Sequence, residues 1–217
     1  MDVETAIRSR RSIKVFDPSH RIDEGETAKL IELATLSPTA FNLQHWRFVV
    51  VRDPLVRFQL RQVAYGQAQV SDAALLIAVC ADVKAWDRDP ARCWRNVGPN
   101  ERNRMVAAIR RFYAPDPQLQ RDEAMRSCAL AAQTLMLAAV ARGHGTCAMD
   151  GFDAAAVARI LNLPPDHLVS MFVAIGRPLE PAGPRPGTIP VAEITATDRF
   201  VDAAPVKEAR LPRAGPA

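Results

Sequence analysis

The feature that most constrains the fold is a run of nine apolar residues, AALLIAVCA, at positions 73–81. A continuous apolar run of this length is typical of a β-strand that is buried on both faces. A similar run lies at 168–175, and RFVVVR at 47–52 is rich in β-branched residues, which favour strands. A shorter strand is predicted at 146–149. The chain is therefore expected to form a layered α/β domain around a central sheet.

Helices are predicted between these strands, because aspartates stand where helices commonly begin. Asp2, Asp23, Asp53 and Asp153 each precede a helix-favouring segment, so each is expected to be an N-cap. Gly143 is the expected C-cap of a long Ala-rich helix. The predicted helices run from Asp2 to Arg8, from Asp23 to the Ser37-Pro38 step, and over 54–63, 100–113, 122–142 and 153–161.

Composition describes an ordinary globular chain and excludes several classes of protein. The 217 residues are 48% hydrophobic and 24% charged, which does not fit a disordered tail, a collagen-like chain or a small disulfide scaffold. No run of about 18 apolar residues is present, so no membrane helix is expected. The N-terminal residues lack the apolar stretch of a secretory signal, and we therefore expect a cytoplasmic protein.

Charge, cysteine and histidine point to no metal and to no nucleic acid. The net charge of +4 and the pI of about 9.1 would permit nucleic-acid binding, but no basic stripe is interleaved with aromatic residues. The four cysteines form no CxxC pair and are expected to be reduced thiols. The four histidines are scattered without metal-ligand spacing, so a protein-bound metal is not expected.

Four polar segments could carry chemistry, and each also has a purely structural explanation. An Arg-rich segment at 8–12 suits phosphate recognition, or it is a solvated helix end. The polar and aromatic loop at 37–46 suits a planar heterocycle, or its polar side chains satisfy a turn. The Gly-rich segment at 143–153 could present backbone N–H groups to a ligand, or it joins a C-cap to an N-cap. The fourth segment, Arg177 to Arg185 among prolines, could complete an anion site or simply lie on the surface.

The combination of these segments is more specific than any one of them. In chain order they are RRSIKVF at 10–16, SPTAFNLQHW at 37–46, GQAQVSDAALLIAVCA at 66–81, AAQTLMLAAVARGHGTCAMDGFD at 131–153, VAIGRP at 173–178 and a late PRP. With these motifs the chain resembles the nitroreductase family of FMN-dependent oxidoreductases. The resemblance covers nearly the whole chain except residues 84–120 and the C-terminal tail.

The resemblance implies an architecture and an assembly. The fold would be α+β, a three-layer sandwich with a central, mainly antiparallel sheet flanked by helices. Residues 1–204 would form a single domain, with a flexible tail at 205–217. The protein would be a homodimer with two FMN sites at the subunit interface, and its C-terminal segment would wrap around the partner subunit.

The resemblance also assigns cofactor-binding roles. The phosphate and ribityl end of FMN would contact Arg10, Arg11, Ser12 and, closing the site, Arg185. The flavin would be reached from the partner subunit by Pro38, Thr39, Asn42 and Gln44. The pyrimidine edge of the ring would contact Gln69. The backbone N–H that faces flavin N5 would come from the segment that contains Asp150 and Gly151.

The implied activity is a ping-pong cycle in which NADH or NADPH reduces FMN and then leaves. A small acceptor such as a nitroaromatic, a quinone or an activated enone would then be reduced in the same space. No side chain is required as a general acid, since water can supply a proton. Two alternatives stay open: a specialised member that performs reductive dehalogenation or flavin chemistry, and a flavin-binding protein without turnover.

Three features depart from the family pattern or vary within it. His45 stands where the family commonly has proline before Trp46, and we assign it no catalytic role. Gln69 stands where some members carry lysine, so the midpoint potential of bound flavin is expected to be lower than in a Gln69→Lys variant.

Residues 84–120 correspond to an excursion that often covers the active site. Three of the aromatic residues of that excursion either shape the acceptor pocket or pack against the core: Trp94, Phe112 and Tyr113.

Overall fold

The computed structural model describes residues 1–200, which fall into two units, one of Met1–Ala182 and one that begins at Gly183. The first unit is built on a four-stranded sheet with the order β1-β2-β4-β3, in which every neighbouring pair is antiparallel. The strands are β1 (Trp46–Val51), β2 (Leu75–Asp82), β3 (Gly145–Met149) and β4 (His167–Gly176). The predicted antiparallel sheet is therefore confirmed, with β1 and β3 at its two edges.

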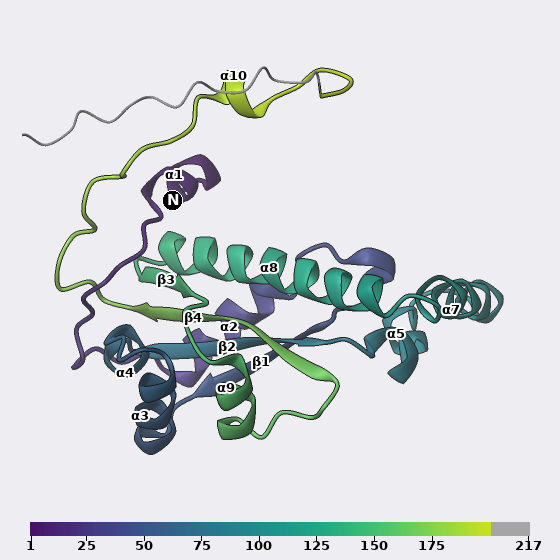
Figure 1. The fold of residues 1–217 in the computed structure, drawn as a ribbon, viewed down its shortest axis with the longest axis horizontal. Helices are drawn as coiled ribbons and strands as arrows, with labels where there is room; N and C mark the ends of the chain where they lie inside the picture. The colour runs from purple at the N-terminus through teal and green to yellow at the C-terminus, as the bar shows by residue number, and fades with distance from the viewer. Residues whose placement is uncertain (201–217) are drawn as a thin grey trace, which may run out of the picture. The chain divides into compact units, whose positions relative to one another are not determined.

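Helices cover both faces of this sheet (Figure 1). Leu75, Ile77 and Val79 of β2 point to the face covered by α2 (Glu24–Ala34) and α8 (Pro117–Ala141). Leu76 and Ala78 point to the opposite face, which is covered by α3 (Pro54–Val63) and α9 (Ala154–Ile160). Because side chains alternate along a strand, an apolar run such as 73–81 can serve two cores at once. The expected three-layer α+β sandwich is confirmed.

The aspartate caps are all present. The carboxylate of Asp2 accepts the N–H of Thr5 at the start of α1 (Val3–Ser9), and Asp23, Asp53 and Asp153 make the corresponding bonds for α2, α3 and α9. Gly143 follows the end of α8 with a φ of +85°, a conformation that favours glycine. The start of α8 was predicted wrongly, since it begins at Pro117 rather than at 122. Asp116 caps it, and residues 117–121 lack the apolar period that marks a helix.

Helix α8 is the central core helix. Among the described helices it is long and apolar enough to cross a membrane, judged by length and composition alone. Its residues Cys128, Leu135 and Ala139 are fully buried against the sheet in this fold. Burial against β2 and β4 therefore accounts for its apolar character.

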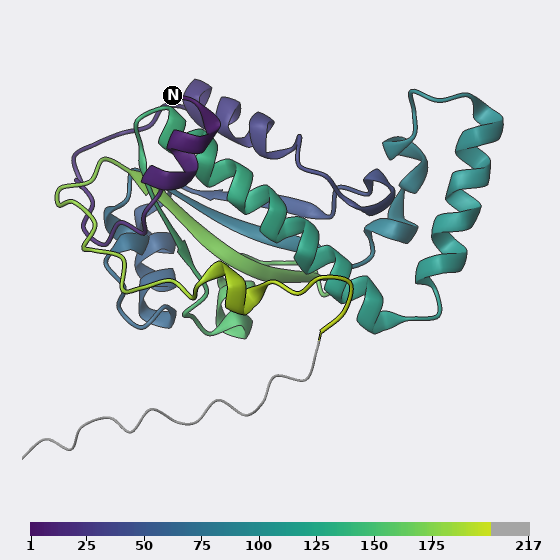
Figure 2. The ribbon, with the colours of Figure 1, turned by 90° about the horizontal axis from the view of Figure 1, so that it is seen from above.

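Residues 84–120 project beyond one end of the sheet (Figures 1 and 2). They contain α5 (Ala85–Arg88), α6 (Pro90–Cys93), the predicted helix α7 (Pro99–Tyr113) and the start of α8. A small third core attaches them to the loop that precedes β1, with the buried residues Leu43, Trp86, Ile109 and Tyr113. The two segments are thus one packing unit.

The second unit contributes the short helix α10 (Val191–Ile194). Every described residue from Gly183 to 200 is exposed, including the large apolar side chains of Ile189, Val191 and Phe200. This stretch builds no core of its own. The predicted tail at 205–217 lies outside the described residues, and the extent of the single domain stays a prediction.

Candidate functional site

The predicted phosphate-binding segment lies beside the edge strand β3. Ser12 forms a parallel β-bridge with Thr146, and the N–H of Ile13 donates to the carbonyl of Thr146 at 2.9 Å. Gly145 permits this approach, because a Cβ there would lie only 2.7 Å from the side chains of Ile13 and Pro178. Residues 10–14 are therefore held against one end of an exposed sheet edge.

Positive charge gathers at that end of β3. Nζ of Lys14 lies 4.0 Å from Sγ of Cys147, and Ser12 makes a side-chain hydrogen bond with the same thiol. Burial raises the pKa of Cys147, while the charges of Lys14 and Arg10 act in the opposite direction. Arg10, Ser12 and Lys14 thus converge on one point of the strand, and the half-buried Arg11 stands between them in the chain. This cluster offers cations and a hydroxyl to an anion.

The other end of β3 leads into the turn at Asp150 and Gly151. Within residues 1–200 the backbone N–H groups of these two residues donate to no acceptor. The side chain of Gln67 donates to the carbonyl of Gly151 at 2.9 Å, which joins this turn to the segment that precedes α4 (Gln69–Asp72). Gln69 itself, the first residue of α4, is buried. The predicted flavin-edge residues are therefore brought to the same end of the strand.

The two ends of β3 together describe the shape of a ligand. Thr146 and Asp150 are four residues apart, which is roughly 13 Å along an extended strand. The cationic side chains lie beside Thr146, and the N–H donors lie at Asp150 and Gly151. The arrangement fits an elongated ligand with an anionic group at one end and hydrogen-bond acceptors at the other, and a phosphorylated flavin has that chemistry.

The loop at 37–46 holds backbone strain. Phe41, Asn42 and Gln44 have φ values of +53°, +56° and +49°, in the left-handed region. Such conformations cost about 1 kcal/mol or more each for residues other than glycine, and they persist where surrounding contacts enforce them. Here the hydroxyl of Thr39 accepts the N–H of Gln44 at 3.2 Å. Strained, well-held loops of this kind concentrate at functional sites.

Contacts with the excursion and with α8 hold the loop in place. Asn42 donates its side-chain amide to the carbonyl of Cys93 at 2.8 Å, and Nε1 of Trp94 donates to the carbonyl of Phe41 at the same distance. The hydroxyl of Ser37 bonds that of Thr134 on α8 at 2.7 Å. The loop is thus positioned by two separate elements.

His45 is a buried part of this attachment. Its ring is 1% exposed, and Nδ1 lies 3.1 Å from the hydroxyl of Ser127 on α8. Burial lowers its pKa from 6.5 to about 4, with the charge of Asp82 acting in the opposite direction and that of Arg47 reinforcing the shift. His45 is therefore a buried, neutral side chain whose hydrogen bond to Ser127 joins the loop to α8. This structural role agrees with our assigning it no part in catalysis.

A single chain does not bring the loop and the Arg-rich segment together. The loop leads into β1, whereas residues 10–14 lie along β3 at the opposite edge of the sheet. They also lie at opposite ends, because Trp46 pairs with Ala81 near one end and Thr146 pairs with Ile175 near the other. Pro38, Thr39, Asn42 and Gln44 therefore cannot share a ligand with Arg10 of the same chain. Arg185 belongs to the second unit.

Several residues of the site had no signal in the sequence. Gln67 supports the Gly151 turn from 84 positions away, and Cys147 lies among the cations because the N-terminal segment crosses β3 at that point. Both contacts depend on tertiary structure. Lys14 did have a signal in the sequence, because it stands close to the Arg-rich segment that suits phosphate recognition.

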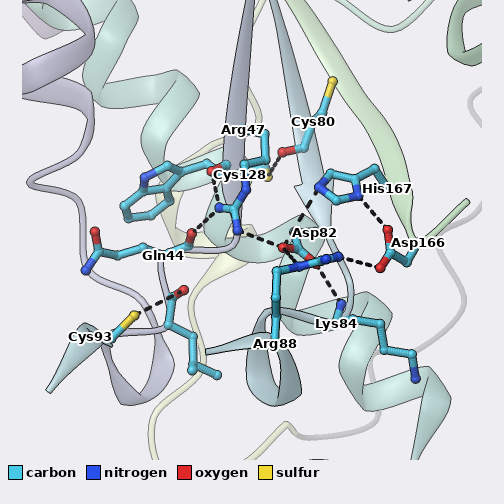
Figure 3. A network of polar contacts seen from close by, with 12 residues as sticks. Gln44, Arg47, Cys80, Asp82, Lys84, Arg88, Cys93, Cys128, Asp166 and His167 are labelled. Atoms are coloured by element: carbon cyan, nitrogen blue, oxygen red, sulfur yellow. Dashed lines mark hydrogen bonds and ion pairs between the residues drawn. The ribbon is translucent and has the colours of Figure 1, made fainter. Parts of the chain in front are cut away.

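A second polar cluster surrounds the buried carboxylate of Asp82 (Figure 3). Arg47 and Arg88 donate to its Oδ2 at 2.7 and 3.1 Å, and the N–H of Lys84 donates to Oδ1 at 3.0 Å. Asp166 pairs with Arg88 and accepts a hydrogen bond from His167 at 2.8 Å. Asp82, Asp166 and His167 are close enough to share a metal ion, but their carboxylates are already bound to arginines. The cluster is an ion-pair network that orients Arg47 and Arg88.

Comparison with known proteins places the chain in a family. The sequence pattern described as the nitroreductase family matches residues 7–177, and the chain belongs to that family. It is 50% identical over 199 residues to Protein DrgA of Synechocystis sp., covering 89% of this chain and 95% of that protein. It is 35% identical over 188 residues to an NADH dehydrogenase of Thermus thermophilus, covering 85% and 90%.

Solved structures agree with this assignment. A crystal structure of an Exiguobacterium sibiricum protein in complex with FMN matches with a TM-score of 0.84 at 28% identity, covering 90% of this chain and 97% of that chain. The family and fold that the sequence motifs predicted are therefore confirmed, and the protein is an oxidoreductase of this class.

The burial of His45 predicts a pH-dependent stability. Because its folded-state pKa lies below the unfolded value, the unfolded chain binds more protons between pH 6.5 and 4. The contribution of neutral His45 to the free energy of unfolding is complete above pH 6.5. It is lost on acidification, which lowers the free energy of unfolding by roughly 2 kcal/mol between pH 7.5 and 5. Urea unfolding at both pH values should show a smaller acid loss for His45→Gln than for the wild type. Equal acid losses in the two proteins would contradict this assignment.

Proposed function

We propose that the protein binds FMN, takes hydride from NADH or NADPH, and passes it to a small organic acceptor. The observation that carries the proposal is the edge of β3, where a cationic cluster is separated by roughly the length of an elongated phosphorylated ligand from two N–H groups that have no acceptor among residues 1–200. The names of the related NADH dehydrogenase and of the FMN complex support the same chemistry.

The residues of this chain have distinct parts in the proposed site. Arg10, Arg11 and Ser12 would bind the phosphate and the ribityl chain, and Arg185 would close that end. The N–H groups of Asp150 and Gly151 would donate to the flavin near N5, and Gln69 would meet its pyrimidine edge. When bound, FMN supplies the ability to accept and return a hydride. The protein supplies position, hydrogen-bond donors and a pocket that excludes competing reactions.

The proposed active unit is a homodimer. In a dimer the strained loop of one subunit, with Pro38, Thr39, Asn42 and Gln44, can reach the flavin of the other. Within one chain the loop and Arg10 lie too far apart to contact the same ligand. In a dimer, the loop of one subunit and Arg10 of the other can contact the same flavin, and the separation therefore supports this assembly. The exposed apolar side chains of the C-terminal unit, such as Ile194 and Phe200, suit an arm that wraps around a partner subunit.

The proposed reaction is a ping-pong cycle in which nicotinamide and acceptor use the same space in turn. Nitroaromatics, quinones and activated enones are the acceptor classes we propose, and the proposed location is the cytoplasm. Of the excursion residues Trp94, Phe112 and Tyr113, Tyr113 is 1% exposed and Trp94 is half-buried, in keeping with packing roles. Phe112 is 51% exposed and is the one we propose to contact an acceptor.

The visible spectrum of the purified protein tests the proposed function. We expect the bands of oxidised flavin, and we expect them to bleach when NADH or NADPH is added without oxygen. Bands that persist at saturating concentrations of both nucleotides would contradict the reductase proposal and favour flavin binding without turnover. A colourless protein that cannot be reconstituted with FMN would overturn the proposal entirely.

The identity of residue 69 predicts a change in redox potential. Gln69 is buried beside the proposed flavin edge, so Gln69→Lys places a positive charge there that favours the reduced, more negative cofactor. Potentiometric titration should give a higher midpoint potential for Gln69→Lys than for the wild type. Gln59→Lys, at an exposed position of α3, adds the same charge elsewhere and should leave the potential unchanged. Equal potentials for Gln69→Lys and wild type would remove Gln69 from the flavin edge.

A further inference from the structure

A cavity of about 790 Å³ lies between the strained loop and the excursion. The loop and the start of β1 contribute Asn42, Gln44 and Arg47, while α5 and the segment from α6 onward contribute Arg88, Arg92 and Arg95. Its volume is in the range of pockets that bind small molecules and cofactors.

The walls of the cavity are strongly cationic. Four arginines line it against one carboxylate, that of Asp89, which accepts the N–H of Arg92 at 3.3 Å and so caps α6. Arg47 and Arg88 are held on the wall by Asp82, on which both converge (Figure 3). Because Asp82 and Asp166 offset the charge of these two arginines, the unbalanced positive charge of the cavity comes from Arg92 and Arg95, set against Asp89.

The two remaining arginines are available for a ligand. Within the described residues, the guanidinium groups of Arg92 and Arg95 form no ion pair and no hydrogen bond. Burial and the charge of Asp89 raise the pKa of the Cys93 thiol. The charges of Arg47, Arg92 and Arg95 act on this pKa in the opposite direction. All three guanidinium groups line this one cavity, where an anion would relieve their mutual repulsion.

The neutral groups of the cavity suit the same ligand. Asn42, Gln44 and Asn96 contribute amide groups, which can donate to phosphate oxygens or to a ribose. Arginine is the residue best matched to the paired oxygens of a phosphate. A single inorganic phosphate would fill only a small part of this volume, whereas a nucleotide fills a cavity of this size.

We propose that this cavity binds the phosphate-bearing part of the nicotinamide dinucleotide that reduces the enzyme, with Arg92 and Arg95 as its anion-binding residues. The inference rests on the proposed function, in which the loop that forms one wall reaches the flavin of the partner subunit. The cavity then adjoins that flavin, and the excursion selects the reductant. An acceptor that carries a carboxylate could pair with the same arginines. The experiment below therefore distinguishes the phosphates of the dinucleotide from the carboxylate of an acceptor.

The test compares Arg92→Ala/Arg95→Ala with a control that removes the same charge elsewhere. Arg104→Ala/Arg111→Ala is that control, since both residues are exposed on α7 and do not line the cavity. The first measurement is calorimetric titration of the intact holoprotein with inorganic pyrophosphate. The second is KM and kcat for NADH and NADPH with a neutral quinone, and KM for a quinone that carries a carboxylate.

Loss of charge-assisted hydrogen bonds should weaken pyrophosphate binding and raise the KM of the dinucleotide at least tenfold in the cavity variant, with kcat nearly unchanged. The control variant should behave like the wild type. Unchanged pyrophosphate binding and unchanged KM in the cavity variant would overturn the proposal. A rise confined to the KM of the anionic quinone would also overturn it and assign the cavity to the acceptor. Failure of the proposed function is distinguished by flavin bands that neither nucleotide bleaches in the wild type.

Discussion

The position of β3 at the edge of the sheet is the constraint on which the candidate site depends. An edge strand leaves one side of its backbone without a partner strand, and that side is available to other groups. Here the N-terminal segment occupies only one end of it, through Ser12 and Ile13, and brings cations to that end. The close approach at Gly145 allows this contact, and the turn at Asp150 and Gly151 follows the strand with two N–H donors that have no acceptor in the described part of the chain. The side of β3 without a partner strand is where we propose that the ligand binds.

The opposite edge carries the other half of the proposed site. The strained loop before β1 is held by α8 on one side and by the excursion on the other, so its unusual backbone is fixed before any ligand binds. The same attachment positions the arginine-lined cavity, in which the buried Asp82 orients Arg47 and Arg88. Because the two halves lie at different edges and different ends of one sheet, we propose that a second copy of the chain joins them into one site.

Local signals explain how much of this could be predicted from the sequence. Four aspartate caps, Gly143 and the apolar strands depend on near neighbours, and all were placed correctly. The antiparallel topology and the site residues came from motif resemblance, because pairing between distant strands has no local signature. The early start of α8, the Gln67–Gly151 contact and the Asp82 network were missed for physical reasons. The start of α8 was missed because residues 117–121 lack an apolar period, and the other two depend on partners that lie far away in the chain.

The central claim is that one flavin site is assembled from the β3 edge of one subunit and the loop of the other. Its most direct test is subunit complementation, in which Arg10→Ala/Ser12→Ala and Thr39→Ala/Asn42→Ala chains with different tags are co-expressed and the mixed dimer is purified. A mixed dimer contains one site with both defects and one with neither. The account predicts that it binds FMN at one of its two sites, with wild-type affinity, while each variant homodimer binds weakly. A mixed dimer that binds no better than either homodimer would contradict it.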